Sequence, residues 1–207
     1  FMLLIPQSVG AADPTTDATV TFTGSDPTPT MPVDPDDPDS PGTLPGTGMN
    51  GPLSIDYVPD LAFGTQSITG NLEVYEATDL KPYLQVTDKR GGVEGWEVSV
   101  TLSSFTNGDS SSSFDGVIAF SNGDVATTTN NPSAAPTAYS KQVTSGQSGQ
   151  VVFGTTAPQQ GMGTWINRWY PNASVTTNDS ITLTVHTAGV LADTYTAVLT
   201  WAISNAP

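Results

Sequence analysis

The chain has 207 residues, 36% of them hydrophobic, which is enough for one sizeable β domain with a core and polar tails. Its formal net charge is −15, from 20 acidic and 5 basic residues, so nucleic acid and anionic membrane surfaces are poor partners because both would be repelled. Cysteine is absent, which excludes disulfides and thiolate chemistry, and no apolar stretch is long enough to cross a bilayer.

The first residues have the order of a secretory signal that is truncated at its start. Residues 1–12 run from an apolar stretch into small residues, with Ala11 or Ala12 at the expected cut, but the usual basic start is missing. The alternative is an N-terminal strand of the domain. Within residues 13–24, the alternation of Ala18–Thr23 predicts a short strand.

Residues 25–52 are rich in proline and aspartate. Proline removes amide donors and the aspartates repel one another, so we predict a disordered, extended linker. Weak Ca²⁺ binding is the alternative, but the segment lacks the Gly and final Glu of an EF-hand loop.

Leu44–Gly48 fits the sortase pattern Leu-Pro-x-Thr-Gly. A long β-patterned region follows it in place of an apolar anchor and basic tail, so we interpret it as linker.

Two long stretches dominate residues 53–207. Thr194–Ser204 and Gly95–Ser103 both alternate, and both are rich in β-branched and aromatic residues, which is typical of half-buried strands. We expect Thr194–Ser204 to be a central strand, because a terminal segment this apolar is rarely left loose. Further strands are predicted at residues 53–58, 61–64, 83–87, 116–121, 150–154, 164–169 and 180–187.

Short strands separated by polar loops indicate an all-β fold. The loops at 107–113, 122–135 and 145–150 are rich in Ser, Thr, Asn and Gly. We predict a β-sandwich or barrel-like, mainly antiparallel domain over residues 53–207. Its last two strands, 180–187 and 194–204, are expected to form an antiparallel, hairpin-like pair.

Several stretches occur together with a distinctive spacing: Gly51–Pro59, Leu61–Gly64, Leu84–Asp88 with Gly95–Val100, Gly163–Trp165, and Tyr195–Pro207. Together they resemble the WxL domain of Gram-positive surface proteins, from about Ala18 to Pro207. The segments beginning at Trp96 and Trp201 are similar to the two Trp-x-Leu motifs of that family. Their third positions are Val98 and Ile203, which keep the aliphatic bulk of Leu.

The resemblance implies a secreted protein held non-covalently on the cell wall, with peptidoglycan as its ligand. It also implies partner surface proteins from the same gene cluster. On that basis the leading hypothesis is a cell-wall binding protein without catalysis. The alternative is an adhesive or structural protein whose β domain binds a partner surface or host protein, for example by strand addition at an open sheet edge.

The motif tryptophans are interpreted as core residues. Trp96 shares a face with Val98, and Trp201 shares a face with Ile203, so each indole lies among aliphatic side chains. The alternative is that the indoles stack on sugar rings. On the preferred interpretation, the motif marks two facing or neighbouring core strands, and another surface contacts the wall.

Residues 164–171 contain the better surface candidates. Trp165, Asn167 and Trp169 would share one face of a strand, combining rings for sugar stacking with an amide, whereas Arg168 and Tyr170 would lie on the other. Arg168 could meet a muramyl carboxylate, or pair with a surface Asp. Core packing of this stretch is the alternative and the default expectation.

Few residues of the sequence indicate a catalytic or metal site. His186 is the only histidine, is expected on the outer face of its strand, and cannot build a zinc site or charge relay alone. Asp88, Glu94 and Glu97 lie close in sequence, but nothing indicates the fixed carboxylate pair of a glycoside hydrolase. We therefore expect no enzyme activity, no cofactor and no metal.

Overall fold

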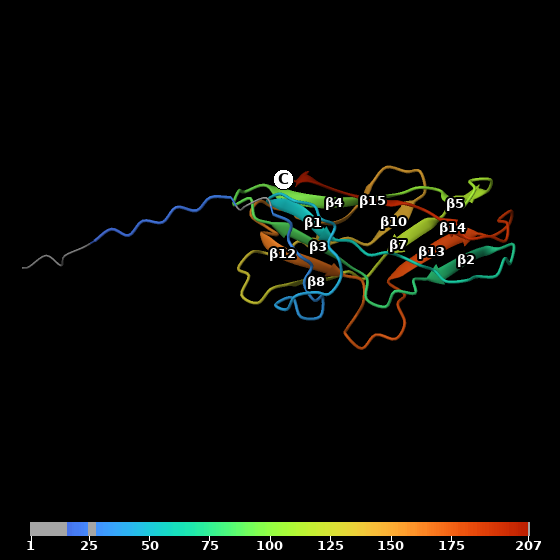
Figure 1. Ribbon diagram of the computed structural model, residues 1–207, viewed down its shortest axis with the longest axis horizontal. Helices are drawn as coiled ribbons and strands as arrows, with labels where there is room; N and C mark the ends of the chain where they lie inside the picture. Colours follow the sequence, from blue (N-terminus) through green and yellow to red (C-terminus); the bar gives the residue numbers. More distant parts are fainter. Residues whose placement is uncertain (1–15, 25–27, 207) are drawn as a thin grey trace, which may run out of the picture.

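The computed structural model describes residues 16–24 and 28–206 (Figure 1). These residues form fifteen strands and no helix, and every pairing between the strands is antiparallel. The predicted all-β, mainly antiparallel class is therefore confirmed. Residues 1–12, where a signal peptide is predicted, lie outside the described residues.

The first sheet is built around a strand that is buried on both faces. This strand, β3 (Tyr83–Asp88), pairs with β1 (Leu53–Tyr57) on one side and with β12 (Gly163–Arg168) on the other. The order is β1-β3-β12-β8, with β8 (Asp124–Thr127) at an edge.

The second sheet contains both tryptophan motifs. Its order is β15-β4-β11-β9, formed by β15 (Leu199–Ala206), β4 (Gly95–Leu102), β11 (Gln150–Gly154) and β9 (Thr137–Ala138). The expectation that the last strand is central is wrong, because among the described residues β15 pairs only with β4 and forms an edge. The predicted alternation of β4 is confirmed, and its buried face consists of Trp96, Val98, Val100 and Leu102.

The third sheet has the order β10-β7-β13-β2. It is formed by β10 (Lys141–Thr144), β7 (Val117–Phe120), β13 (Ile181–His186) and β2 (Leu72–Glu76). Strand β13 lies between β7 and β2. The predicted hairpin-like pair of β13 with the last strand is therefore wrong, since other strands already occupy both edges of β13.

A small sheet closes one end of the body (Figure 1). It has the order β14-β5-β6, from β14 (Tyr195–Thr196), β5 (Phe105–Asn107) and β6 (Ser113–Phe114). One continuous apolar core joins the sheets and includes side chains from β1, β3, β4, β7, β11, β12 and β13. The body is thus a layered β structure that buries its apolar side chains between sheets.

The N-terminal region differs from the sequence prediction in two places. Ala18–Thr23 forms no strand and is exposed, because it finds no neighbouring strand edge with which to pair. Residues 30–47 are not a free linker: they dock on the body, and we call them the N-terminal strap. In the strap, Val33 bridges to Pro41, and the backbone N–H of Val33 donates to Gln85 Oε1 at 2.8 Å. Proline has no backbone N–H, so a proline-rich segment forms few backbone hydrogen bonds of its own. These contacts with the body supply hydrogen-bond partners for the remaining backbone groups of the strap.

Candidate functional site

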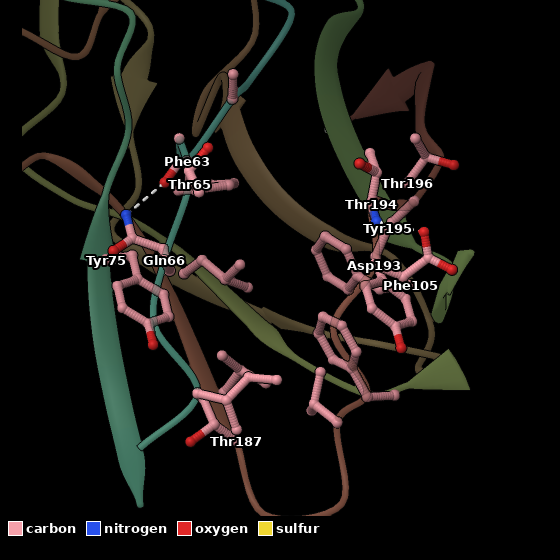
Figure 2. Close-up of a pocket in the computed structure, with 18 of the residues that line it drawn as sticks. Phe63, Thr65, Gln66, Tyr75, Phe105, Thr187, Asp193, Thr194, Tyr195 and Thr196 are labelled. Atoms are coloured by element: carbon pink, nitrogen blue, oxygen red, sulfur yellow. Dashed lines mark hydrogen bonds between the residues drawn. The ribbon is translucent and has the colours of Figure 1, made fainter. Parts of the chain in front are cut away.

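A cleft of about 930 Å³ opens in the described part of the chain. One wall is formed by residues 61–68 and β2, and the other by residues 190–199, as Figure 2 shows. Its floor is apolar, with Leu102, Ile118 and Leu183. We call it the aromatic cleft after five rings in its lining: Phe63, Tyr75, Phe105, Phe114 and Tyr195.

The rings at one end of the aromatic cleft are fixed by mutual packing. Phe105 and Phe114 stack with centroids 5.0 Å apart, and Phe114 meets Tyr195 edge to face at 5.0 Å. The Tyr195 hydroxyl lies 2.9 Å from Ser112 Oγ and donates to the Leu191 carbonyl. This wall is therefore organised before any ligand arrives, which lowers the entropic cost of binding.

The opposite wall carries a hydroxyl without a partner. Tyr75 reaches into the cleft from β2 (Figure 2), and its buried hydroxyl oxygen has no hydrogen bond among the described residues. Nearby, Gln66 Nε2 donates to the Phe63 carbonyl at 2.7 Å. A buried hydroxyl left unpaired is costly, so a ligand that hydrogen-bonds to Tyr75 would remove that cost.

The surface candidates on β12 and in the two residues after it are mostly buried. Trp165, Asn167, Trp169 and Tyr170 are each at most 4% exposed, so they are not available to a ligand in this structure. Both faces of this strand contact protein, which matches the core-packing alternative. Trp165 Nε1 donates to the Met162 carbonyl at 2.9 Å, and Asn167 is buried with both side-chain polar atoms unpaired.

Arg168 remains partly exposed and is held by acidic and backbone oxygens. It pairs with Asp124 across the β12–β8 boundary, and its Nη1 donates to the Pro35 carbonyl of the strap at 3.1 Å. Its Nε is buried without a partner. Pairing with a surface Asp, one of the two roles that the sequence left open for Arg168, is present.

The two tryptophan motifs lie on adjacent strands. Trp96 is fully buried, and its Nε1 donates to the Gly161 carbonyl at 3.0 Å. Gly161 has a φ of 72°, and a Cβ there would lie 2.9 Å from Trp96 Nε1, so only glycine fits this approach. Trp201 is partly buried and contacts Phe120 and Trp169.

The register of β15 against β4 completes this arrangement. Ile203 pairs with Val98 and Trp201 with Val100, so the second motif covers the edge of the strand that carries the first.

A family profile described as "WxL domain surface cell wall-binding" matches residues 10–207. The chain belongs to the WxL-domain family. No curated protein and no solved structure matches it.

The WxL domain is thus a surface domain that binds cell wall, and its signature residues build the scaffold. Val98 is fully buried and Ile203 packs at the core boundary, so aliphatic residues other than Leu serve at these positions. In the described residues no helix is long and apolar enough to cross a membrane.

Within the described residues, no group of three or more His, Asp or Glu side chains is arranged to hold a metal ion. Asp88 is tied to Arg90, with 2.8 Å between Oδ2 and Nη2, and His186 is exposed as expected.

Burial raises the pKa of Asp56, although hydrogen bonds from Ser54, Thr87 and Gln85 act in the opposite direction. That carboxyl links β1 to β3.

Sequence reasoning missed the aromatic cleft. Phe63 was expected in a short strand, residues 61–64, but this segment is an irregular wall of the cleft. Tyr75 lies in β2, which was not predicted at all. The rings come from four distant parts of the chain, so no local motif could reveal the site.

Proposed function

We propose that this WxL domain binds peptidoglycan non-covalently and without catalysis, through the aromatic cleft. The observation that supports the cleft most directly is the buried Tyr75 hydroxyl, which has no hydrogen bond among the described residues, in a cleft whose opposite wall is preorganised. Family membership supports the cell wall as the target. The route to the surface would be secretion, with residues 1–12 as a signal remnant.

The lining suits the glycan part of peptidoglycan. Flat aromatic rings pack against the C–H faces of pyranose rings, while hydroxyl and amide groups bond the sugar's polar edges. Thr65 and Gln66 supply such polar groups in the same wall of the cleft as Tyr75. An uncharged ligand segment also avoids the repulsion that the acidic chain would exert on anionic wall polymers.

The absence of catalysis is proposed from the carboxylates of the cleft. Glycoside hydrolysis uses two positioned carboxyl groups. Among the described residues that line the aromatic cleft, Asp193 alone carries a carboxylate, and Asn107 Nδ2 and the Thr194 N–H already hydrogen-bond to it. Cell walls incubated with the domain should keep their turbidity.

Sedimentation with purified peptidoglycan tests the proposal. Sacculi stripped of protein and anionic polymers should pull down the domain, and denaturant should release it. Failure to sediment with such sacculi, together with binding to untreated walls, would reject peptidoglycan as the ligand.

A partner protein is the second candidate function, favoured by the open edge of β15. This eight-residue strand pairs on one side only, so its other edge can add a strand from a surface or host protein. Binding that requires wall-associated protein, and is lost on stripped sacculi, would favour this candidate.

A further inference from the structure

The N-terminal strap contacts most of the basic side chains of the chain. The chain has five basic residues, and three of them contact the strap. Lys81 Nζ lies 2.7 Å from Asp36 Oδ2, Lys89 Nζ donates to Thr30 Oγ1 at 2.8 Å, and Arg168 Nη1 donates to the Pro35 carbonyl. In a chain this acidic, such a gathering of cations beneath one acidic segment requires an explanation.

Asp36 occupies the centre of this arrangement. Lys81 Nζ donates to one carboxylate oxygen and the Tyr170 hydroxyl donates to the other at 3.0 Å. Partial burial alone would raise the pKa of Asp36, but these hydrogen bonds and the nearby Arg168 charge outweigh it, so the pKa lies below its ordinary value. Lys81 and Tyr170, with the charge of Arg168 nearby, thus form a binding site for a carboxylate.

A groove of about 440 Å³ continues from this site between the strap and the body. Tyr57 and Tyr83 line it as a stacked pair with centroids 4.2 Å apart, offering ring surface beside the carboxylate position. Asp79, which belongs to the body and not to the strap, also lines the groove. A complementary ligand therefore has a carboxylate at one point and a cationic or neutral group elsewhere.

The strap is attached in a way that permits release. Between residues 30 and 47, Pro32 alone is buried, and the segment forms a single bridge in place of a strand. Its contacts with the body are mostly hydrogen bonds, and those of Thr30, Asp36 with Lys81, and Asp39 are exposed, where water and salt compete with them.

We propose that Asp36 is an internal occupant of a carboxylate site, and that this site accepts the stem peptide of the wall when the strap lifts. The stem peptide carries free carboxylates and, in many walls, a lysine or other diamino acid, which matches the charges of the groove. The choice of ligand depends on the proposed function, whereas the site itself rests on the contacts of Asp36.

Titration of a soluble tripeptide, L-Ala-D-isoglutamine-L-Lys, tests the proposal on the full chain. Asp36→Asn removes the competing charge but leaves Lys81, Tyr170 and Arg168, so its association constant should exceed that of the wild type by about tenfold. The matched control is Asp37→Asn, which removes the same charge one residue away. It should bind like the wild type, since Asp37 contacts Ser40 and not the site.

Two further measurements test whether the gain in affinity depends on a carboxylate contact with Lys81. The gain of Asp36→Asn should vanish when the peptide carboxylate is amidated, and also in the double variant Asp36→Asn with Lys81→Gln. Equal binding by the Asp36 and Asp37 variants, or a gain that survives amidation, overturns the proposal. Circular dichroism confirms that each variant is folded. If wild-type protein sediments with sacculi but Asp36→Asn gains nothing, this proposal fails while the proposed function stands.

Discussion

At the scale of single residues, burial separates the two motif tryptophans. Trp96 is fully buried and hydrogen-bonded, so Trp96→Ala should lower the free energy of unfolding by about 3–5 kcal/mol. Trp201 is partly buried on an edge strand, so Trp201→Ala should cost less. Urea unfolding measures both, with exposed Val198→Ala as the control. Equal costs for the two tryptophans would contradict this ranking.

Asn167 carries a different expectation, because its buried amide has no hydrogen bond in the described structure. Asn167→Leu replaces two unpaired polar atoms with apolar ones of similar shape. The variant should be more stable by about 1 kcal/mol, since the desolvation cost of the amide disappears. Thermal unfolding reads this directly, and a lower melting temperature would show that the amide is satisfied in solution.

The sequence pattern predicted the buried face of β4 correctly but did not predict that both faces of β12 are covered. Alternation correctly placed Trp96, Val98 and Val100 inward, because β4 has one polar and one apolar face. In β12 the same alternation suggested an exposed face, but the strap and neighbouring sheets cover both. Period-two patterns identify a face and cannot tell whether a distant segment covers it.

At the scale of elements, β2 and the strap escaped prediction for physical reasons. In β2 the apolar Leu72 and Val74 point outward while Glu73 and Tyr75 face inward more, so no amphipathic pattern marks the strand. The strap is rich in proline and aspartate, which favours disorder in isolation. Its order comes from basic side chains and Gln85 far along the chain.

Asp56 connects these elements and gives a pH-dependent prediction. Its carboxylate accepts from Ser54 and Thr87, and from Gln85, which also contacts the strap. Because burial raises its pKa in the folded state above 3.8, the folded chain holds this proton after the unfolded chain has lost it. The contribution of Asp56 to stability therefore falls as pH rises from 3.8 through the folded pKa.

Asp56→Asn removes this titration, so the wild type should lose stability relative to the variant as pH rises across that window. Urea unfolding at a series of pH values measures the difference. Stability curves that stay parallel across the window would show that Asp56 titrates normally in the folded protein.

At the scale of the whole molecule, the acidic charge and the aromatic cleft are largely separate. The cleft lining includes one carboxylate, whereas the strap carries Asp34, Asp36, Asp37 and Asp39. Binding of uncharged glycan should therefore change little with ionic strength, since salt screens only charge–charge interactions. Titration with soluble N-acetylglucosamine oligomers, which carry no stem peptide and no charge, at low and high salt checks this, and strong salt dependence would contradict it.

The most direct measurement is the affinity of Tyr75 variants for soluble peptidoglycan glycan fragments. Tyr75→Phe should weaken binding by about three- to tenfold, the value of one hydrogen bond, and Tyr75→Ala should weaken it further by removing the ring. Val74→Ala, on the outward face of the same strand, should bind like the wild type. Wild-type affinity in folded Tyr75→Ala would contradict the proposal that this cleft binds the wall.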